Sequence, residues 1–142
     1  MSRPTVIVDT GPLVALADGD DSDHERCVKW LRTCTARLVI PSPIVAEVCY
    51  LLGSRCGADV EAAFLESLAD NEPFEVVAPG RGDYLRMAEL VRIYADFPLG
   101  GSDAAVVALA ERLAAGEIAT LDRRHFSVVR PRDGATFTLV PA

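Results

Sequence analysis

The sequence predicts an α/β fold in which helices cover both faces of a parallel β-sheet. Short runs of β-branched and aliphatic residues alternate along the chain with segments that have helical apolar spacing. Half of the 142 residues are hydrophobic, which suffices for one compact core. No repeat, linker or low-complexity tract interrupts the pattern, so we expect residues 1–142 to form a single domain.

The first strand and the first two helices follow from the N-terminal residues. The β-branched run Thr5–Asp9 predicts a strand that ends in an acid, and the turn at Thr10 leads into a helix that reaches Ala17. The segment His24–Cys34 predicts a second helix, because its apolar side chains fall on one helical stripe. That stripe consists of Cys27, Val28, Leu31 and Cys34.

A second strand and a long helix come next. Arg37–Ile40 predicts a strand closed by Pro41, and Ser42-Pro43 supplies an N-cap and a first-turn proline. The helix that starts there should run to Cys56, where Gly57 stops it.

The second half of the chain repeats the alternation of helix and strand. Gly116 marks the end of the last expected helix. The expected helices are 58–69, 82–95 and 103–114, and the expected strands are 74–77, 118–121 and 136–140. Strands separated by helices form right-handed crossovers, which give a parallel sheet covered on both faces.

Composition narrows the class of protein. The net charge of −7 argues against a passive binder that gains its affinity by neutralising phosphates. No apolar stretch approaches the roughly 20 residues of a membrane span, and the N-terminus lacks a signal-peptide core, so we expect a cytoplasmic protein. The four cysteines follow helical spacing and are interpreted as reduced thiols. One pair could form a disulfide if the protein were exported.

Three aspartates stand where strands end or helices begin. Asp9 and Asp122 each follow an apolar strand, and ligand crevices of parallel sheets lie beyond the carboxyl ends of their strands. Each residue alone fits a turn or a helix N-cap equally well. Asp103 begins a predicted helix after Gly100-Gly101, where Asp103 or Ser102 could act as the cap.

Glu47 is the most informative acid in the sequence. Its helical neighbours are apolar, and no Lys or Arg lies three or four positions away. The neighbours are Pro43, Ile44, Tyr50 and Leu51. We therefore expect the carboxylate to lie on a buried stripe, where it would be costly without a compensating cation.

A cluster of four carboxylates indicates a metal site. Ionised carboxylates held together require a counter-charge, and oxygen ligands select Mg²⁺ or Mn²⁺. The matching chemistry is phosphodiester hydrolysis by a metal-activated water. Two histidines, His24 and His125, are too few for His-rich metal sites, and His125 is interpreted as structural or as a minor substrate contact.

With these residues placed, the chain resembles the PIN-domain ribonucleases, and in particular the VapC toxins of type II toxin–antitoxin pairs. The resemblance covers essentially the whole chain and rests on four motifs in order. They are Val8-Asp9-Thr10-Gly11-Pro12-Leu13, Ile44-Val45-Ala46-Glu47-Val48, Leu99-Gly100-Gly101-Ser102-Asp103-Ala104 and Ala119-Thr120-Leu121-Asp122-Arg123-Arg124-His125-Phe126. Each motif is weak alone, but four in this order and spacing are specific.

The resemblance implies a three-layer α/β/α sandwich with a five-stranded parallel sheet in the order 3-2-1-4-5. It implies that Asp9, Glu47, Asp103 and Asp122 are the catalytic and metal-binding acids for Mg²⁺ or Mn²⁺. Thr120 would orient them, and Asp96 would have a supporting or a structural role.

The resemblance also implies partners: a VapB antitoxin, an RNA substrate such as transfer or ribosomal RNA, and a second copy of the chain in a homodimer. An apolar stripe around Tyr84, Met87, Val91 and Tyr94 favours the dimer, although core packing alone could explain it. Two other functions stay open. The chain could be an inactive PIN-like nucleic-acid-binding module or a structure-specific DNA nuclease.

Overall fold

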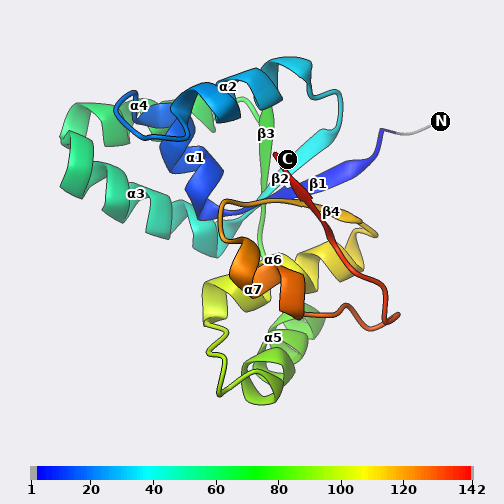
Figure 1. Cartoon of the computed structure of the whole chain (residues 1–142). Coiled ribbons are helices and arrows are strands. Elements are labelled where there is room, and N and C mark those ends of the chain that lie inside the picture. The colour runs from blue at the N-terminus through cyan, green and yellow to red at the C-terminus, as the bar shows by residue number, and fades with distance from the viewer. Residues whose placement is uncertain (1–2, 142) are drawn as a thin grey trace.

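The computed structural model describes residues 3–141, which form one parallel five-stranded sheet and seven helices (Figure 1). The strands are β1 (Thr5–Val8), β2 (Arg37–Pro41), β3 (Phe74–Val77), β4 (Glu117–Ala119) and β5 (Thr138–Val140). The helices are α1 (Thr10–Ala17), α2 (His24–Thr33), α3 (Ser42–Cys56), α4 (Ala58–Ser67), α5 (Arg81–Ile93), α6 (Gly101–Arg112) and α7 (Arg123–Val128). The sheet order is β3-β2-β1-β4-β5, which confirms the predicted fold class and strand order.

The helices form two layers around the sheet. Figure 1 shows α1 to α4 on one side of the strands and α5 to α7 on the other. The central strands are apolar on both faces, and Ile7, Val39 and Ile118 are fully buried. In α6 every residue from Ala104 to Ala110 is buried, because this helix lies between the sheet and α5.

Ion pairs join α5 to α6. Arg86 of α5 donates two hydrogen bonds to Glu111 of α6, at 2.8 and 2.9 Å. Arg112 of α6 donates to Asp83 of α5 at 2.9 Å, and Asp83 is buried. The buried carboxylate also accepts a hydrogen bond from the Gly80 backbone amide at 2.8 Å, so it closes the first turn of α5.

The sheet register places three chain segments side by side at the carboxyl edge. Ile7 pairs with Ile118 and Val8 with Ala119, and the Asp9 amide then donates to the Ala119 carbonyl at 2.9 Å. Because all strands are parallel, the ends of β1, β2 and β4 meet at this one edge. Residues that follow these strands are therefore neighbours in space.

Two element predictions differ from the structure. Helix α7 was not predicted, because its six residues are too few to show helical apolar spacing. Helix α6 starts at Gly101 with Gly100 as N-cap, so neither Ser102 nor Asp103 is the cap residue as expected. The other predicted elements are present, with ends shifted by up to two residues.

Two further predictions concern the cysteines and membrane-spanning segments. All four cysteines are free, so the disulfide alternative is wrong; Cys27 is buried and the other three are partly buried. Between residues 3 and 141, no helix has the length and apolarity that a membrane crossing requires.

Candidate active site

Asp9 lies at the junction of β1 and α1, where the buried strand ends. Its side chain is only 7% exposed, and its Oδ2 accepts a hydrogen bond from the Thr120 hydroxyl at 2.8 Å. Burial raises the pKa of Asp9 to about 6. The Thr10 amide and the Thr120 hydroxyl oppose this rise in pKa, and the Asp103 and Glu47 carboxylates add to it.

Thr120 joins the ends of β1 and β4. Its side chain is fully buried, donates to Asp9 and accepts a hydrogen bond from the Asp122 backbone amide at 2.9 Å. The hydroxyl thus fixes the position of the Asp9 carboxylate relative to the segment that carries Asp122. This is consistent with the orienting role that the family resemblance implies for Thr120.

Asp103 comes from α6, the helix packed across the sheet. It is the third residue of the helix, and its Oδ2 accepts a hydrogen bond from the Gly100 amide at 3.3 Å. Burial raises the pKa of Asp103, and the Asp122 and Glu47 carboxylates raise it further. Asp103 therefore caps the first turn of α6 and also lies near other carboxylates.

The predicted burial of Glu47 is wrong. The buried stripe of α3 consists of Ile44, Val48 and Leu52, and Glu47 lies outside it and is exposed. Tyr50, which suggested an apolar environment, is itself 73% exposed. The Glu47 carboxylate nevertheless contributes to the raised pKa of both Asp9 and Asp103, so it faces the same region.

Asp122 has both of its carboxylate oxygens engaged by one residue. It is the N-cap of α7, and its Oδ1 accepts a hydrogen bond from the His125 backbone amide at 3.1 Å. Its Oδ2 lies 2.5 Å from Nδ1 of the His125 ring. The helix-cap interpretation of Asp122 is therefore correct, and it does not exclude a place in the site.

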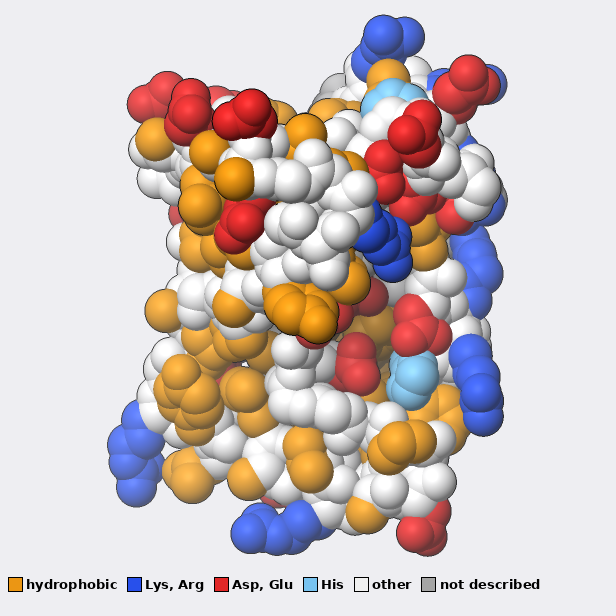
Figure 2. Space-filling view, turned by 90° about the vertical axis from the view of Figure 1, so that its left-hand side faces the viewer, with side chains coloured by type: hydrophobic (Ala, Val, Ile, Leu, Met, Phe, Trp, Pro, Cys, Tyr) orange, Lys and Arg blue, Asp and Glu red, His pale blue; other side chains and the backbone are white. Residues whose placement is uncertain are grey.

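Together these residues form an acidic region at the carboxyl edge of the sheet. Figure 2 shows acidic side chains and a histidine around a hollow on the side where β1 runs into α1 in Figure 1. Within residues 3–141, no three His, Cys, Asp or Glu side chains already stand close enough to hold a metal ion. Asp96 is exposed in the segment between α5 and α6.

His125 is more closely integrated into this region than the sequence indicated. Its ring packs edge-on against Phe97 with centroids 5.0 Å apart, and its Nδ1 contacts Asp122. Phe97 belongs to the segment before α6, which the sequence treats as a loop. The sequence carries one signal for this contact, because Asp122 and His125 have the spacing of an N-cap residue and the third residue of a helix.

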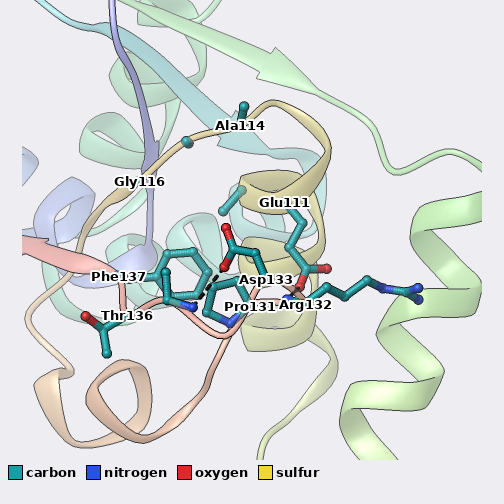
Figure 3. A pocket seen from close by; sticks show the side chains of 11 residues that line it. Glu111, Ala114, Gly116, Pro131, Arg132, Asp133, Thr136 and Phe137 are labelled. Carbon is teal, nitrogen blue, oxygen red and sulfur yellow. Dashed lines mark hydrogen bonds between the residues drawn. The ribbon is translucent and has the colours of Figure 1, made fainter.

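Several cavities lie outside the acidic region, and two of them are relevant to possible partners. One, of about 400 Å³, lies at the opposite edge of the sheet, between the end of α6 and residues 131–137 (Figure 3). Its Glu111 and Asp133 carboxylates accept hydrogen bonds from the Arg132 and Ala135 amides at 2.7 and 2.9 Å. The other is an apolar groove of about 420 Å³ between α1 and α4.

Comparison with known proteins identifies the family. The model of the PIN-domain family matches residues 6–130. The chain belongs to the PIN-domain family. This PIN-domain chain is also 38% identical over 136 residues to Ribonuclease VapC26 of Mycobacterium tuberculosis (strain ATCC 25618 / H37Rv). That match covers 96% of this chain and all of the relative, so the chain is a VapC-family ribonuclease toxin of the VapBC type.

Solved structures show the same fold at low sequence identity. M. tuberculosis VapC20, a toxin that cleaves the sarcin–ricin loop, superposes with a TM-score of 0.74 at 16% identity, over 80% of this chain and 86% of that one. DNA-bound VapBC from Salmonella typhimurium gives a TM-score of 0.69 at 14% identity, over 96% and 98% of the two chains. The PIN-domain chain thus shares its fold with toxins crystallised in toxin–antitoxin complexes.

Proposed function

We propose that this VapC-family protein hydrolyses RNA at the carboxyl edge of its sheet with the help of Mg²⁺ or Mn²⁺. The observation that carries the proposal is Asp9, a buried carboxylate whose raised pKa is increased further by Asp103 and Glu47. Acids held together in this way are stabilised by a cation, and a cation in turn attracts a phosphate.

The chemistry of the side chains fits such an ion. Asp9, Glu47 and Asp103 offer oxygen ligands, as Mg²⁺ and Mn²⁺ require. Residues 3–141 form no preformed three-ligand cage. This is compatible with Mg²⁺, which keeps several waters and uses one or two carboxylates together with substrate phosphates. Beside Asp9, the Thr10 hydroxyl is buried without a hydrogen-bond partner among the described residues, as suits a site completed by a hydrated ligand.

Each residue then has a distinct role. A bound Mg²⁺ or Mn²⁺ supplies an activated water and stabilises negative charge on the phosphodiester. Asp9 and Asp103 would hold the ion from the end of β1 and from α6, and Glu47 would approach it from α3 with an exposed side chain. Thr120 keeps the Asp9 carboxylate in one orientation. A direct contact of Asp122 with the ion stays a prediction. The two hydrogen bonds between the Asp122 carboxylate and His125 do not favour this contact.

A direct test uses a labelled RNA hairpin with the sarcin–ricin loop sequence, because a structural neighbour cleaves that loop. Transfer RNA serves as the second substrate, and a DNA hairpin of the same sequence as the third. Cleavage of RNA with Mn²⁺ or Mg²⁺, and none with EDTA, is expected. Binding without cleavage would indicate an inactive module, and preferential cleavage of DNA would indicate a DNA nuclease.

We propose that an antitoxin docks in the groove between α1 and α4. The groove between α1 and α4 is lined mainly by apolar side chains, among them Leu13, Leu16, Phe64 and Phe74. An amphipathic helix of a VapB-type antitoxin would bury its apolar face there. Leu16→Glu should weaken co-purification of the co-expressed antitoxin while RNA cleavage by the free toxin persists. Unchanged antitoxin binding would place the partner elsewhere.

A further inference from the structure

We propose that Arg123 and Arg124, the first two residues of α7, bind a phosphate of the RNA that neighbours the cleaved one. The RNA backbone would then run along the carboxyl edge of the sheet, from the acids at the end of β1 to the arginines beside β5. The inference rests on the proposed RNA hydrolysis and adds residues that hold the substrate.

The first step concerns a local excess of positive charge in and after α7. Residues 123–130 contain three arginines and no aspartate or glutamate, although the chain as a whole has a net charge of −7. The three arginines, Arg123, Arg124 and Arg130, are exposed. None of them forms an ion pair with an acid among residues 3–141, whereas six other arginines do. A guanidinium group is always protonated in proteins, so this segment presents positive charge without an acidic partner.

The second step concerns the place of this charge at the sheet. The Thr120 hydroxyl donates to the Asp9 carboxylate, and the Thr120 amide donates to the Val140 carbonyl of β5 at 2.8 Å. The next carbonyl along the chain, that of Pro141, accepts a hydrogen bond from Nη2 of Arg123 at 2.9 Å. The Arg123 guanidinium is therefore fixed at the same carboxyl edge as the acids. The end of β5 lies two strand spacings, roughly 10 Å, from the end of β1.

The third step concerns the donors that these side chains still offer. Arg123 uses only Nη2 for its contacts with residues 3–141, so its Nε and Nη1 groups remain free to donate. Arg124 is exposed and its side chain has no hydrogen bond to the described residues. Arg130 differs, because its Nη1 donates to the Ser127 and Val128 carbonyls at 2.7 and 3.2 Å and closes the end of α7. The two arginines of the first turn are thus the ones available to an anion.

The fourth step concerns the ligand. A cation between Asp9 and Asp103 would bind the phosphate that is cleaved, but the same carboxylates would repel the phosphates on either side of it. A second positive charge beside the acids would offset this repulsion and fix the register of the strand without reading its sequence. Figure 2 shows Lys or Arg side chains next to the histidine at the acidic hollow, where such a strand would leave it.

The test measures binding of a fluorescently labelled RNA hairpin by anisotropy in EDTA, so that binding is separated from cleavage. At about 100 mM salt, Arg123→Gln and Arg124→Gln should each bind about tenfold more weakly than the wild type, the value of one charge-assisted hydrogen bond. The matched control is Arg32→Gln, which should bind like the wild type. Arg32 is also exposed and has no ion pair among the described residues, but it lies in the last turn of α2, before the amino end of β2.

Two further measurements identify the contact as a phosphate. Each lost contact should lower the slope of log affinity against log salt by about 0.7. Neutral methylphosphonate linkages, placed one at a time through the hairpin loop, should weaken wild-type binding about tenfold at one position. At that position the same linkage should cost Arg123→Gln almost nothing, because the contact is already lost. A DNA hairpin of the same sequence should show the same losses in both arginine variants, since phosphate contacts do not depend on the sugar.

Structural damage is distinguished by two controls. Circular dichroism checks that each variant is folded, and Arg123→Lys, which keeps the charge, should regain part of the lost affinity.

Two results would overturn the inference. The first is RNA affinity of Arg123→Gln and Arg124→Gln equal to that of Arg32→Gln, with an unchanged salt slope. Loss of the co-expressed antitoxin in these variants with normal RNA binding would assign the arginines to a protein interface. The second is a methylphosphonate penalty that is equal in wild type and Arg123→Gln at every linkage. Because binding is measured without cleavage, a wild type that does not hydrolyse RNA would contradict the proposed function alone.

Discussion

At the scale of the residue, the buried carboxylate of Asp9 lowers the stability of the folded protein at neutral pH. Asp9 is buried in the folded state, where burial raises its pKa from 3.8 to about 6. The folded protein therefore binds this proton more tightly than the unfolded chain. The resulting destabilisation is complete above pH 6 and disappears below about pH 4, and it amounts to at most about 3 kcal/mol.

Asp9→Asn should relieve this destabilisation. In EDTA at pH 7.5 the variant should melt higher than the wild type, by about 5 °C or more, since a neutral amide can keep the hydrogen bond from Thr120. The difference should shrink as the pH falls to 5, because the wild-type carboxyl becomes protonated. Melting curves of both proteins between pH 5 and 8 check this, and a difference that is independent of pH would contradict the assigned origin.

A cation should act on the same group of acids. Added Mn²⁺ should raise the wild-type melting temperature at pH 7 by mass action on the folded state. Asp103→Asn should gain clearly less from Mn²⁺, because one oxygen ligand has become a neutral amide. The amide oxygen can still accept from the Gly100 amide, so the first turn of α6 is retained. An equal metal-induced shift in both proteins would remove Asp103 from the cation site.

Sequence reasoning at this scale succeeded where a residue was tied to a strand end. Asp9 and Asp122 could be placed because parallel strands end at one edge. The exposure of Glu47 could not be predicted, because apolar neighbours on α3 do not reveal which side of the helix meets the sheet. His125 was underrated, because its contacts with Asp122 and Phe97 depend on a helix too short to predict and on a tertiary contact.

At the scale of the element, the pairing of α5 with α6 depends on a buried charge. Asp83 is 6% exposed and is neutralised by Arg112, whose own side chain is 45% exposed. Arg112→Met should lower the free energy of unfolding by about 1–3 kcal/mol, because it leaves the carboxylate buried without its partner. Urea denaturation measures the loss. The matched control is Arg92→Met, an exposed arginine of α5, which should cost under about 0.5 kcal/mol.

The elements themselves were largely predictable, since β1, β2 and α3 carry clear signals in β-branched runs, proline and terminal glycine. The first residue of α6 was not predictable, because several neighbouring residues could act as its N-cap. These residues are Gly100, Gly101, Ser102 and Asp103. In the structure the Asp103 carboxylate accepts a hydrogen bond from the Gly100 amide, and Gly100 is the N-cap.

At the scale of the whole molecule, α3 and α5 leave large apolar side chains in solvent. Tyr50, Tyr84, Leu85 and Ile93 are between 57% and 73% exposed. Part of the predicted α5 stripe instead packs against the core, through Met87 and Tyr94. The exposed part still favours the proposed homodimer.

Sedimentation at micromolar concentration should therefore show a dimer, and Tyr84→Lys combined with Leu85→Lys should shift it to monomer. Circular dichroism controls for loss of the fold. A wild type that stays monomeric throughout this concentration range would contradict the homodimer.

We propose above that the acidic edge of the sheet is a cation-dependent RNA-cleaving site. The most direct test of this function is cleavage of the labelled hairpin by wild type and Asp103→Asn, each with Mn²⁺ and with EDTA. We expect the wild type to cleave the hairpin with Mn²⁺ but not with EDTA, and the variant to lose at least about 100-fold of this activity. Equal cleavage by the two proteins, or wild-type cleavage that persists in EDTA, would contradict it.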